Sequence, residues 1–436
     1  MLNICWVTFL FLMVWGFLRQ KNLLSPTGIF IGYSALVFPV SFLVSDLFEI
    51  GSIFFRSPSE MPISMQWSAL FAVVLGVGSF WLGRHYVNSA ALKWSDFEIK
   101  RGNLKILIVL SAVTAGVSAG YLFNILGGVS RVFSELGAIR SGELSGLGVY
   151  TYAITMLLPT SMQFMMIYLI RVNHPHKNWG VVACVLSSLL GGVFGFRGPV
   201  MALLLQVFSI YFIMTGRPNR KTMVFILMFL VPIATFSGFL RVFLNEAFWD
   251  LAENMNFSDI TAYASDLLLT RVRGVETFVL MKEYVDFAEF GYFFDNLRES
   301  VSSLLPTIFF DKGNSLSEVI ATKVYGKYLF DAGILKDVYG GVSYTYIAEA
   351  YWGFGFAGIS IFCLFFGALF RVVENGHSIS LIKIILYKAL AGFCLLLVET
   401  PQLGINAIVV NVVFNFVLML FLAMSLFGTH RSKLVI

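Results

Sequence analysis

Long apolar runs alternate with short polar stretches along most of the chain. A bilayer core about 30 Å thick needs about 20 consecutive apolar residues for each helix that crosses it. Eleven runs fit this length, at about 2–18, 28–48, 66–83, 106–126, 149–170, 179–195, 199–215, 222–240, 346–370, 380–399 and 406–427. The pattern therefore predicts an all-α integral membrane protein with about eleven transmembrane helices.

The spacing of the runs divides the chain into three parts. Residues 1–240 hold the first eight predicted helices, residues 241–345 form one large polar insertion, and residues 346–436 hold the last three helices. The insertion carries nine Lys or Arg and fifteen Asp or Glu residues, and a helical stretch runs through it from Glu276 to Phe287. Ordered loops of this length are usually functional. We expect a large helical outer loop whose short amphipathic helices lie over the mouth of the bundle.

Composition agrees with a membrane protein. Hydrophobic residues make up 58% of the chain and charged residues 13%, whereas soluble domains have roughly 45–50% and about 25%. The net charge of +5 comes without a basic cluster or a base-stacking module, which argues against a nucleic-acid partner. All four cysteines lie in apolar runs, so we expect packing residues rather than disulfides or a metal site. No cofactor is expected.

Basic residues are distributed unequally between the two sets of loops. Short loops that carry an excess of Lys and Arg usually face the cytoplasm. One alternating set, at 19–27, 84–105, 171–178, 216–221, 371–383 and 428–436, holds sixteen basic residues, and the short loops of the other set hold four. We therefore expect the amino terminus and the insertion outside and the carboxyl terminus in the cytoplasm.

Arg197 is the first candidate for chemistry on the outer side. All five histidines fall in predicted cytoplasmic loops, so an outer general base must be Asp, Glu or Tyr. Arg197 lies in Gly195-Phe-Arg-Gly-Pro199, immediately before the seventh predicted helix. A guanidinium at a helix amino terminus suits an anion such as a phosphate. The alternative is an arginine that anchors the hairpin by reaching toward water.

Three further arginines lie in or next to the insertion. Arg241 closes the eighth predicted helix, and Arg271 and Arg273 are two residues apart. The latter two share a face only if their segment is extended rather than helical. We expect one of them to point at a substrate, and the alternative for each arginine is an ordinary loop charge at a membrane surface.

Glu349 and Glu399 are the candidate carboxylates. Glu349 stands about one turn into the ninth predicted helix, and Glu399 ends the tenth on the same side. A carboxylate within a membrane helix is costly to bury and is a functional candidate by default. Two carboxylates at a similar depth are compatible with acid/base work. Either could instead pair with Arg197 or Arg241 as a structural ion pair, because buried charges are normally paired.

Aromatic residues gather where the insertion returns to the membrane. Tyr344, Tyr346, Tyr351 and Trp352 lie within nine residues of one another. Such residues form the aromatic belt at a membrane surface, and they also stack on sugars. Tyr344 and Tyr351 are therefore candidates for substrate binding, with the interfacial belt as the alternative.

Together these features resemble the bacterial O-antigen polymerase (Wzy) family of oligosaccharide repeat-unit polymerases. The resemblance rests on the eleven predicted helices, the Phe196-Arg-Gly-Pro199 hairpin, the large outer loop late in the chain, and Ile347-Ala-Glu-Ala-Tyr-Trp-Gly-Phe-Gly355. In the arrangement of predicted helices and loops the resemblance covers the whole chain. At the level of sequence motifs it covers only these short stretches.

The resemblance implies a metal-independent membrane glycosyltransferase of GT-C-like architecture in the bacterial inner membrane. It would transfer a growing glycan from undecaprenyl pyrophosphate to the nonreducing end of another lipid-linked repeat unit, building O-antigen or a related surface polysaccharide. The implied partners are these lipid-linked glycans, membrane lipid and a chain-length regulator protein. The residues expected at the site are Glu349, Arg197 and Arg241 for catalysis, and Arg271, Arg273, Tyr344, Tyr351 and Glu399 for substrate binding.

Three other functions fit part of the pattern. A lipid-linked oligosaccharide transporter, or flippase, would also be basic and cross the membrane many times. The related O-antigen ligases are associated with an outer-loop histidine, which this sequence lacks on that side. A structural partner of an envelope assembly complex would not need arginines and carboxylates on one face.

Overall fold

The computed structural model describes residues 2–20, 22–47, 60–87, 96–128, 148–190, 197–216, 273–287, 344–375 and 379–424, and all regular structure within these ranges is helical. In chain order the helices are α1 (Leu2–Leu18), α2 (Pro26–Ala35), η1 (Leu36–Val40), α3 (Ser41–Leu47), α4 (Ile63–Tyr86), α5 (Arg101–Ile125), α8 (Gly148–Tyr152), η4 (Ala153–Leu157), α9 (Leu158–Arg171), α10 (Lys177–Leu190), α11 (Arg197–Thr215), α15 (Gly274–Phe287), α19 (Tyr346–Asn375), α20 (Leu381–Glu399) and α21 (Pro401–Ala423). The short elements η1 and η4 are π-helical turns.

Ten of the eleven predicted crossings fall on described helices. The elements α2, η1 and α3 form one continuous apolar span, and α8, η4 and α9 form another. Among the described residues, seven helical spans are long and apolar enough to cross a membrane, and three more helices are apolar but shorter. The remaining predicted crossing, 222–240, lies outside the described residues. The described chain is therefore an all-α protein with several helices of membrane-crossing length.

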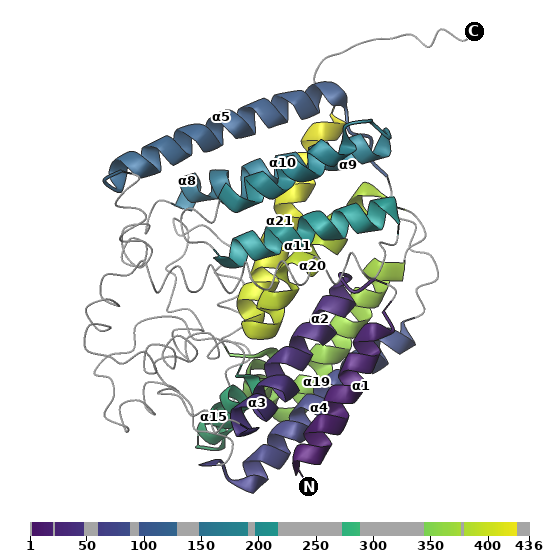
Figure 1. Cartoon of the computed structure of the whole chain (residues 1–436), viewed down its shortest axis with the longest axis vertical. Coiled ribbons are helices and arrows are strands. Elements are labelled where there is room, and N and C mark those ends of the chain that lie inside the picture. The colour runs from purple at the N-terminus through teal and green to yellow at the C-terminus, as the bar shows by residue number, and fades with distance from the viewer. Residues whose placement is uncertain are drawn as a thin grey trace.

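The described helices form two groups that meet along α20 (Figure 1). The elements α1, α2, α3, α4, α15 and α19 form one group, and α5, α9, α10, α11 and α21 form the other. Within the first group, α4 and α19 run side by side. A side-chain carbon on Gly83 would collide with the carbonyl group of Leu364, and one on Gly367 with that of Phe80. Small residues of this kind let membrane helices approach closely.

Loops that the charge pattern assigns to the cytoplasm meet at one end of the helices, which we call the basic end. The Arg84 guanidinium there lies 2.6 Å from the Glu374 carboxylate. The same carboxylate accepts a hydrogen bond from the backbone N–H of Thr27 at 2.8 Å. These contacts join the first turn of α2 to the ends of α4 and α19.

A second polar contact holds the other group at the same end. Arg171 donates to Asp96 at 3.0 Å and to the carbonyl oxygen of Ile379 at 3.1 Å. The backbone N–H of Leu381 also donates to Asp96, at 2.9 Å. Burial alone would raise the pKa of the Asp96 carboxyl, but these hydrogen bonds outweigh it and lower the pKa. The described residues of the segments 19–27, 84–105, 171–178 and 371–383 thus lie at one end of the helices, as the alternation of the loops predicts.

Helix α19 is broken near its start. Its backbone leaves helical geometry at Phe354 (φ −145°, ψ 27°) and Gly355 (φ 60°, ψ −145°), and glycine adopts the second conformation without a steric penalty. The rings of Tyr346 and Phe362 stack at 6.3 Å, although a straight helix would separate them by about 24 Å. The short limb (346–353) therefore folds back along the long limb (356–375). The predicted continuous span 346–370 is wrong on this point, because hydropathy does not reveal a reversal of direction.

The short limb begins about halfway between the two ends of the bundle. A side-chain carbon on Gly76, near the middle of α4, would contact Ile347 of the short limb at 3.5 Å and Ile359 of the long limb at 3.2 Å. Tyr346 packs edge-on against Phe38 at 5.6 Å, and Phe38 lies in η1, near the middle of the α2–α3 span. The amino terminus of the short limb is thus deep within the bundle.

Candidate functional site

Helix α15, from the polar insertion, packs inside the bundle. It contacts η1, α3, α4 and α19, and its buried apolar side chains are Val275, Phe278, Val279 and Met281. The predicted helix over 276–287 is confirmed and begins slightly earlier, at Gly274. The expectation that the helices of the insertion lie over the mouth of the bundle is wrong for α15. The apolar face of α15 packs against the neighbouring helices, which removes more apolar surface from water than a position at the mouth of the bundle would.

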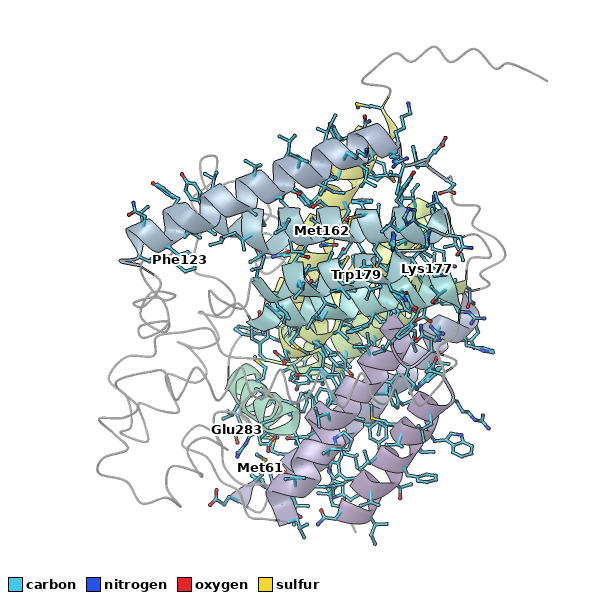
Figure 2. All side chains as sticks on the ribbon, turned by 45° about the horizontal axis from the view of Figure 1, so that its top comes forward. Met61, Phe123, Met162, Lys177, Trp179 and Glu283 are labelled. Carbon is cyan, nitrogen blue, oxygen red and sulfur yellow. The ribbon has the colours of Figure 1, made fainter. Side chains whose placement is uncertain are left out.

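Helix α15 runs from half-depth toward the end opposite the basic end. At its start, a side-chain carbon on Gly274 would come within 2.6 Å of the Phe38 ring. Further along, Lys282 Nζ lies 3.7 Å from Met65 Sδ, in the first turn of α4, and Figure 2 shows Glu283 at this end of α15. The amino termini of α15 and of the short limb therefore both lie against Phe38. Free N–H groups and the helix dipole make such termini favourable for an anion.

Arg273 and Glu276 bring charge to this point. Arg273 directly precedes α15 and is 1% exposed, and Glu276 lies in the first turn of α15 and is fully buried. Burial raises the pKa of the Glu276 carboxyl, and the nearby Arg273 guanidinium opposes the rise. Ser45 of α3 lies beside the carboxyl group, and its hydroxyl also opposes the rise of the Glu276 pKa. A guanidinium and a carboxyl group are thus held together inside the bundle.

Buried hydroxyl groups lie on the elements that pack against α15. Ser41 and Ser45 are on α3, and Tyr346 begins the short limb. None of these hydroxyl groups has a well-formed hydrogen bond with a described residue, although the Glu276 carboxyl lies beside Ser45 and the Ser34 hydroxyl beside Tyr346. Because most buried polar groups in proteins are paired, this cluster is suited to a polar ligand that supplies the missing hydrogen bonds.

Tyr344 and Tyr351 are buried inside the bundle, and Tyr351 packs against α15. Tyr344 is fully buried and Tyr351 is 6% exposed. The Tyr351 ring packs edge-on against Phe278 of α15, with ring centres 5.2 Å apart. The interfacial-belt interpretation is therefore wrong for these two residues, because the fold-back of the short limb turns them inward.

The two predicted carboxylates lie on different elements. Glu349 is one turn into the short limb, where its backbone N–H donates to the carbonyl oxygen of Thr345 at 3.0 Å. Glu399 is the last residue of α20, and its carboxylate accepts a hydrogen bond from the Tyr33 hydroxyl of α2. Tyr33 thus fixes the Glu399 carboxylate against α2.

The other predicted arginines are only partly placed. Arg197 is the first residue of α11, and Pro199 lies in the first turn of that helix, as predicted. The side chain of Arg197 lies outside the described residues, as do Arg241 and Arg271 entirely. Of the predicted arginines, Arg273 is the one whose surroundings the described part of the chain defines.

Two charged residues of interest were not predicted as site residues. Glu276 belonged only to a predicted helical stretch, and its position three residues after Arg273 was the available signal. Lys388, near the middle of α20, is 1% exposed. Its Nζ donates to Gln163 Oε1 at 2.5 Å, and Gln163 Nε2 donates to Gln206 Oε1 at 3.1 Å. A lysine inside an apolar run was the signal for this network.

Within the described ranges, no three His, Cys, Asp or Glu side chains are grouped in a way that could hold a metal ion. Comparison of the chain with protein-family models, curated proteins and solved structures finds no match. The chemistry of the site therefore rests on its own residues: a buried guanidinium and two helix amino termini for an anion, and a carboxyl group and hydroxyls for a polar neighbour.

Proposed function

We propose that this protein is a membrane glycosyltransferase that polymerises undecaprenyl-pyrophosphate-linked oligosaccharide repeat units at the outer face of the bacterial inner membrane. The sequence resemblance to the O-antigen polymerases is the source of this proposal. It places the basic end in the cytoplasm and α15 on the outer side, with about eleven crossings in all and a GT-C-like architecture.

The observation that carries the proposal is Arg273, buried where the amino termini of α15 and the short limb meet Phe38. A leaving pyrophosphate develops negative charge, and fixed donors in a site without water stabilise that charge strongly. Arginine supplies a planar pair of N–H donors without a metal ion. A polyprenyl chain can remain in lipid while its pyrophosphate reaches this point between the spans.

The remaining predicted residues complete the proposed site. Arg197, Arg241 and Arg271 add positive charge from the outer ends of their segments. Tyr344 and Tyr351 offer aromatic faces to the sugars, and Glu399 contributes to substrate binding. Glu349 is the carboxylate that the sequence pattern favours for activating the acceptor hydroxyl.

The test is elongation of a defined lipid-linked repeat unit by the purified protein in proteoliposomes, with products separated on a gel. The wild-type protein should form a ladder of longer glycans. Arg273→Gln should slow elongation by about 10²-fold or more, and Arg273→Lys should recover little of the loss because a point charge does not reproduce the planar fork.

Lys282→Gln is the matched control, since Lys282 lies on the same helix but contacts Met65. Rates are compared per folded molecule. A ladder of normal length and rate from folded Arg273→Gln would contradict the role of Arg273, and the absence of any ladder from the wild-type protein would contradict the polymerase itself.

A lipid-linked oligosaccharide transporter is the second candidate. Its support is the break at Gly355 and the half-helix amino termini at half-depth, which are features of secondary transporters. The same proteoliposomes distinguish the two functions. A transporter should move the labelled glycan from one leaflet to the other without lengthening it, whereas a polymerase should lengthen it.

A further inference from the structure

Glu276 is a buried titratable group that is not among the site residues predicted from the sequence. The proposed function gives it no role. This residue is fully buried in the first turn of α15. The Ser45 hydroxyl and the Arg273 guanidinium lie close to the carboxylate, whose oxygens have no well-formed hydrogen bond with a described residue. A buried carboxyl group with so few donors is costly, and we take its retention at this position to indicate a bound partner.

The position of Glu276 defines the chemistry of that partner. Arg273 and the amino terminus of α15 attract an anion at one side of the carboxyl group. A ligand that lies against both groups carries a phosphate beside Arg273 and, next to it, a hydroxyl that can donate a hydrogen bond to Glu276. A sugar bound close to a pyrophosphate has this combination.

Among the described residues that surround it, Glu276 is the acidic residue that lies beside Arg273. Among the elements packed against α15, α3 carries Asp46, which accepts a hydrogen bond from Asn3 at 2.7 Å. The short limb carries Tyr346, Glu349 and Tyr351. The element η1 has no titratable side chain, and α4 has its titratable residues at the basic end. Arg273 is the charged group that acts directly on the Glu276 carboxyl.

We propose that Glu276 is the catalytic base that accepts the proton of the attacking acceptor hydroxyl. This inference rests on the proposed polymerase function and replaces Glu349 in that role. The proton acceptor, Glu276, and the proposed pyrophosphate site at Arg273 are then three residues apart in the chain. Such closeness suits a reaction in which the attacking oxygen must come within about 3–3.5 Å of the carbon that carries the leaving group.

The proposed step transfers one proton and one glycan. The O–H bond of the acceptor hydroxyl breaks, and its proton passes to the Glu276 carboxylate. The oxygen forms a bond to the anomeric carbon of the donor glycan. The bond from that carbon to the pyrophosphate oxygen breaks, and the electron pair leaves with polyprenyl pyrophosphate beside Arg273. The proton on Glu276 passes to water before the next cycle.

The test measures elongation per folded molecule between pH 5 and pH 9 for the wild type, Glu276→Gln and Glu349→Gln. Glu276→Gln should lose about 10²–10⁴-fold in rate. The wild-type rate should rise with pH as the carboxyl loses its proton, and burial of Glu276 should place this rise above the ordinary carboxyl pKa of about 4.3. The Gln variant should lack the rise. Glu283→Gln is the matched control, on the same helix at its far end.

Near-normal turnover of Glu276→Gln, or loss of turnover in Glu349→Gln alone, would overturn the inference. A wild-type protein that forms no longer glycan would instead overturn the proposed function. If Glu276→Gln fails to fold, dicyclohexylcarbodiimide, which reacts with carboxyl groups in apolar surroundings, is used on the wild type. The reagent should modify Glu276 and stop elongation, and bound lipid-linked substrate should protect Glu276 from modification. Continued elongation after modification, or no protection, would contradict the base assignment.

Discussion

Lys388 shows how a single buried amine is held between spans. Its Nζ donates to Gln163 Oε1 at 2.5 Å and lies 5.6 Å from the centre of the Phe164 ring. Gln163 in turn donates to Gln206 of α11. A side-chain carbon on Gly392 would come within 2.5 Å of Gln206, so this glycine makes room for the amide. One lysine thus organises polar contacts among α9, α11 and α20.

Removing the acceptor should cost more stability than removing the lysine. Gln163→Leu leaves the buried amine without this partner and should lower the free energy of unfolding by about 1–3 kcal/mol. Lys388→Met replaces the amine with an apolar chain of similar length and should be nearly neutral. Thermal unfolding in detergent measures both, with Lys105→Met on the exposed face of α5 as the control. Equal losses in Gln163→Leu and Lys388→Met would contradict this account.

At the scale of elements, the contact between α4 and α19 depends on glycine. Gly83→Ala would place a methyl group on the carbonyl of Leu364 and force the helices apart, at a cost of about 1–3 kcal/mol. Gly78→Ala is the matched control on α4, because a side-chain carbon at Gly78 meets nothing within 4 Å. Thermal unfolding should separate the two variants. A loss in Gly78→Ala as large as that in Gly83→Ala would point to helix flexibility instead.

The sequence predicts the positions of the helices more accurately than their packing. The periodic apolar runs place α15 correctly from Glu276 onward and identify nearly all described spans, because burial in lipid requires long apolar segments. The fold-back at Gly355 could not be read from hydropathy, which records length and not direction. The burial of Tyr351 and Glu276 follows from that fold-back and from the position of α15. The sequence therefore identified Arg273 as a candidate and did not identify Glu276.

At the scale of the whole molecule, each of the two helix groups has its own polar contact at the basic end. Arg84 joins α4 to α19 through Glu374, and Arg171 joins α9 to the start of α20 through Asp96 and Ile379. Since these loops belong to the set that carries the excess of basic residues, the positive-inside rule predicts that this end faces the cytoplasm. The orientation is open to direct measurement.

An impermeant maleimide added to intact cells should label Ser315→Cys in the insertion and spare Asn173→Cys in the loop before α10. Both variants are made with Cys5 replaced by Ser, because Cys5 is the half-buried native thiol while Cys184, Cys363 and Cys394 are buried. Asn173→Cys should react once the membrane is permeabilised. Its labelling in intact cells would reverse the orientation of the whole protein.

The break at Gly355 also affects how the protein is made. The short limb begins deep within the bundle and ends at Phe354. It therefore does not cross the membrane by itself, and we predict that reporter fusions placed before Tyr344 and at Phe354 report the same compartment. During synthesis the short limb leaves the ribosome before the long limb against which it packs. Docking of the short limb must therefore follow insertion of the spans. Substitutions at Gly355 should give a chain in which every helix has inserted with its normal topology. In that chain the short limb should not be packed against the long limb.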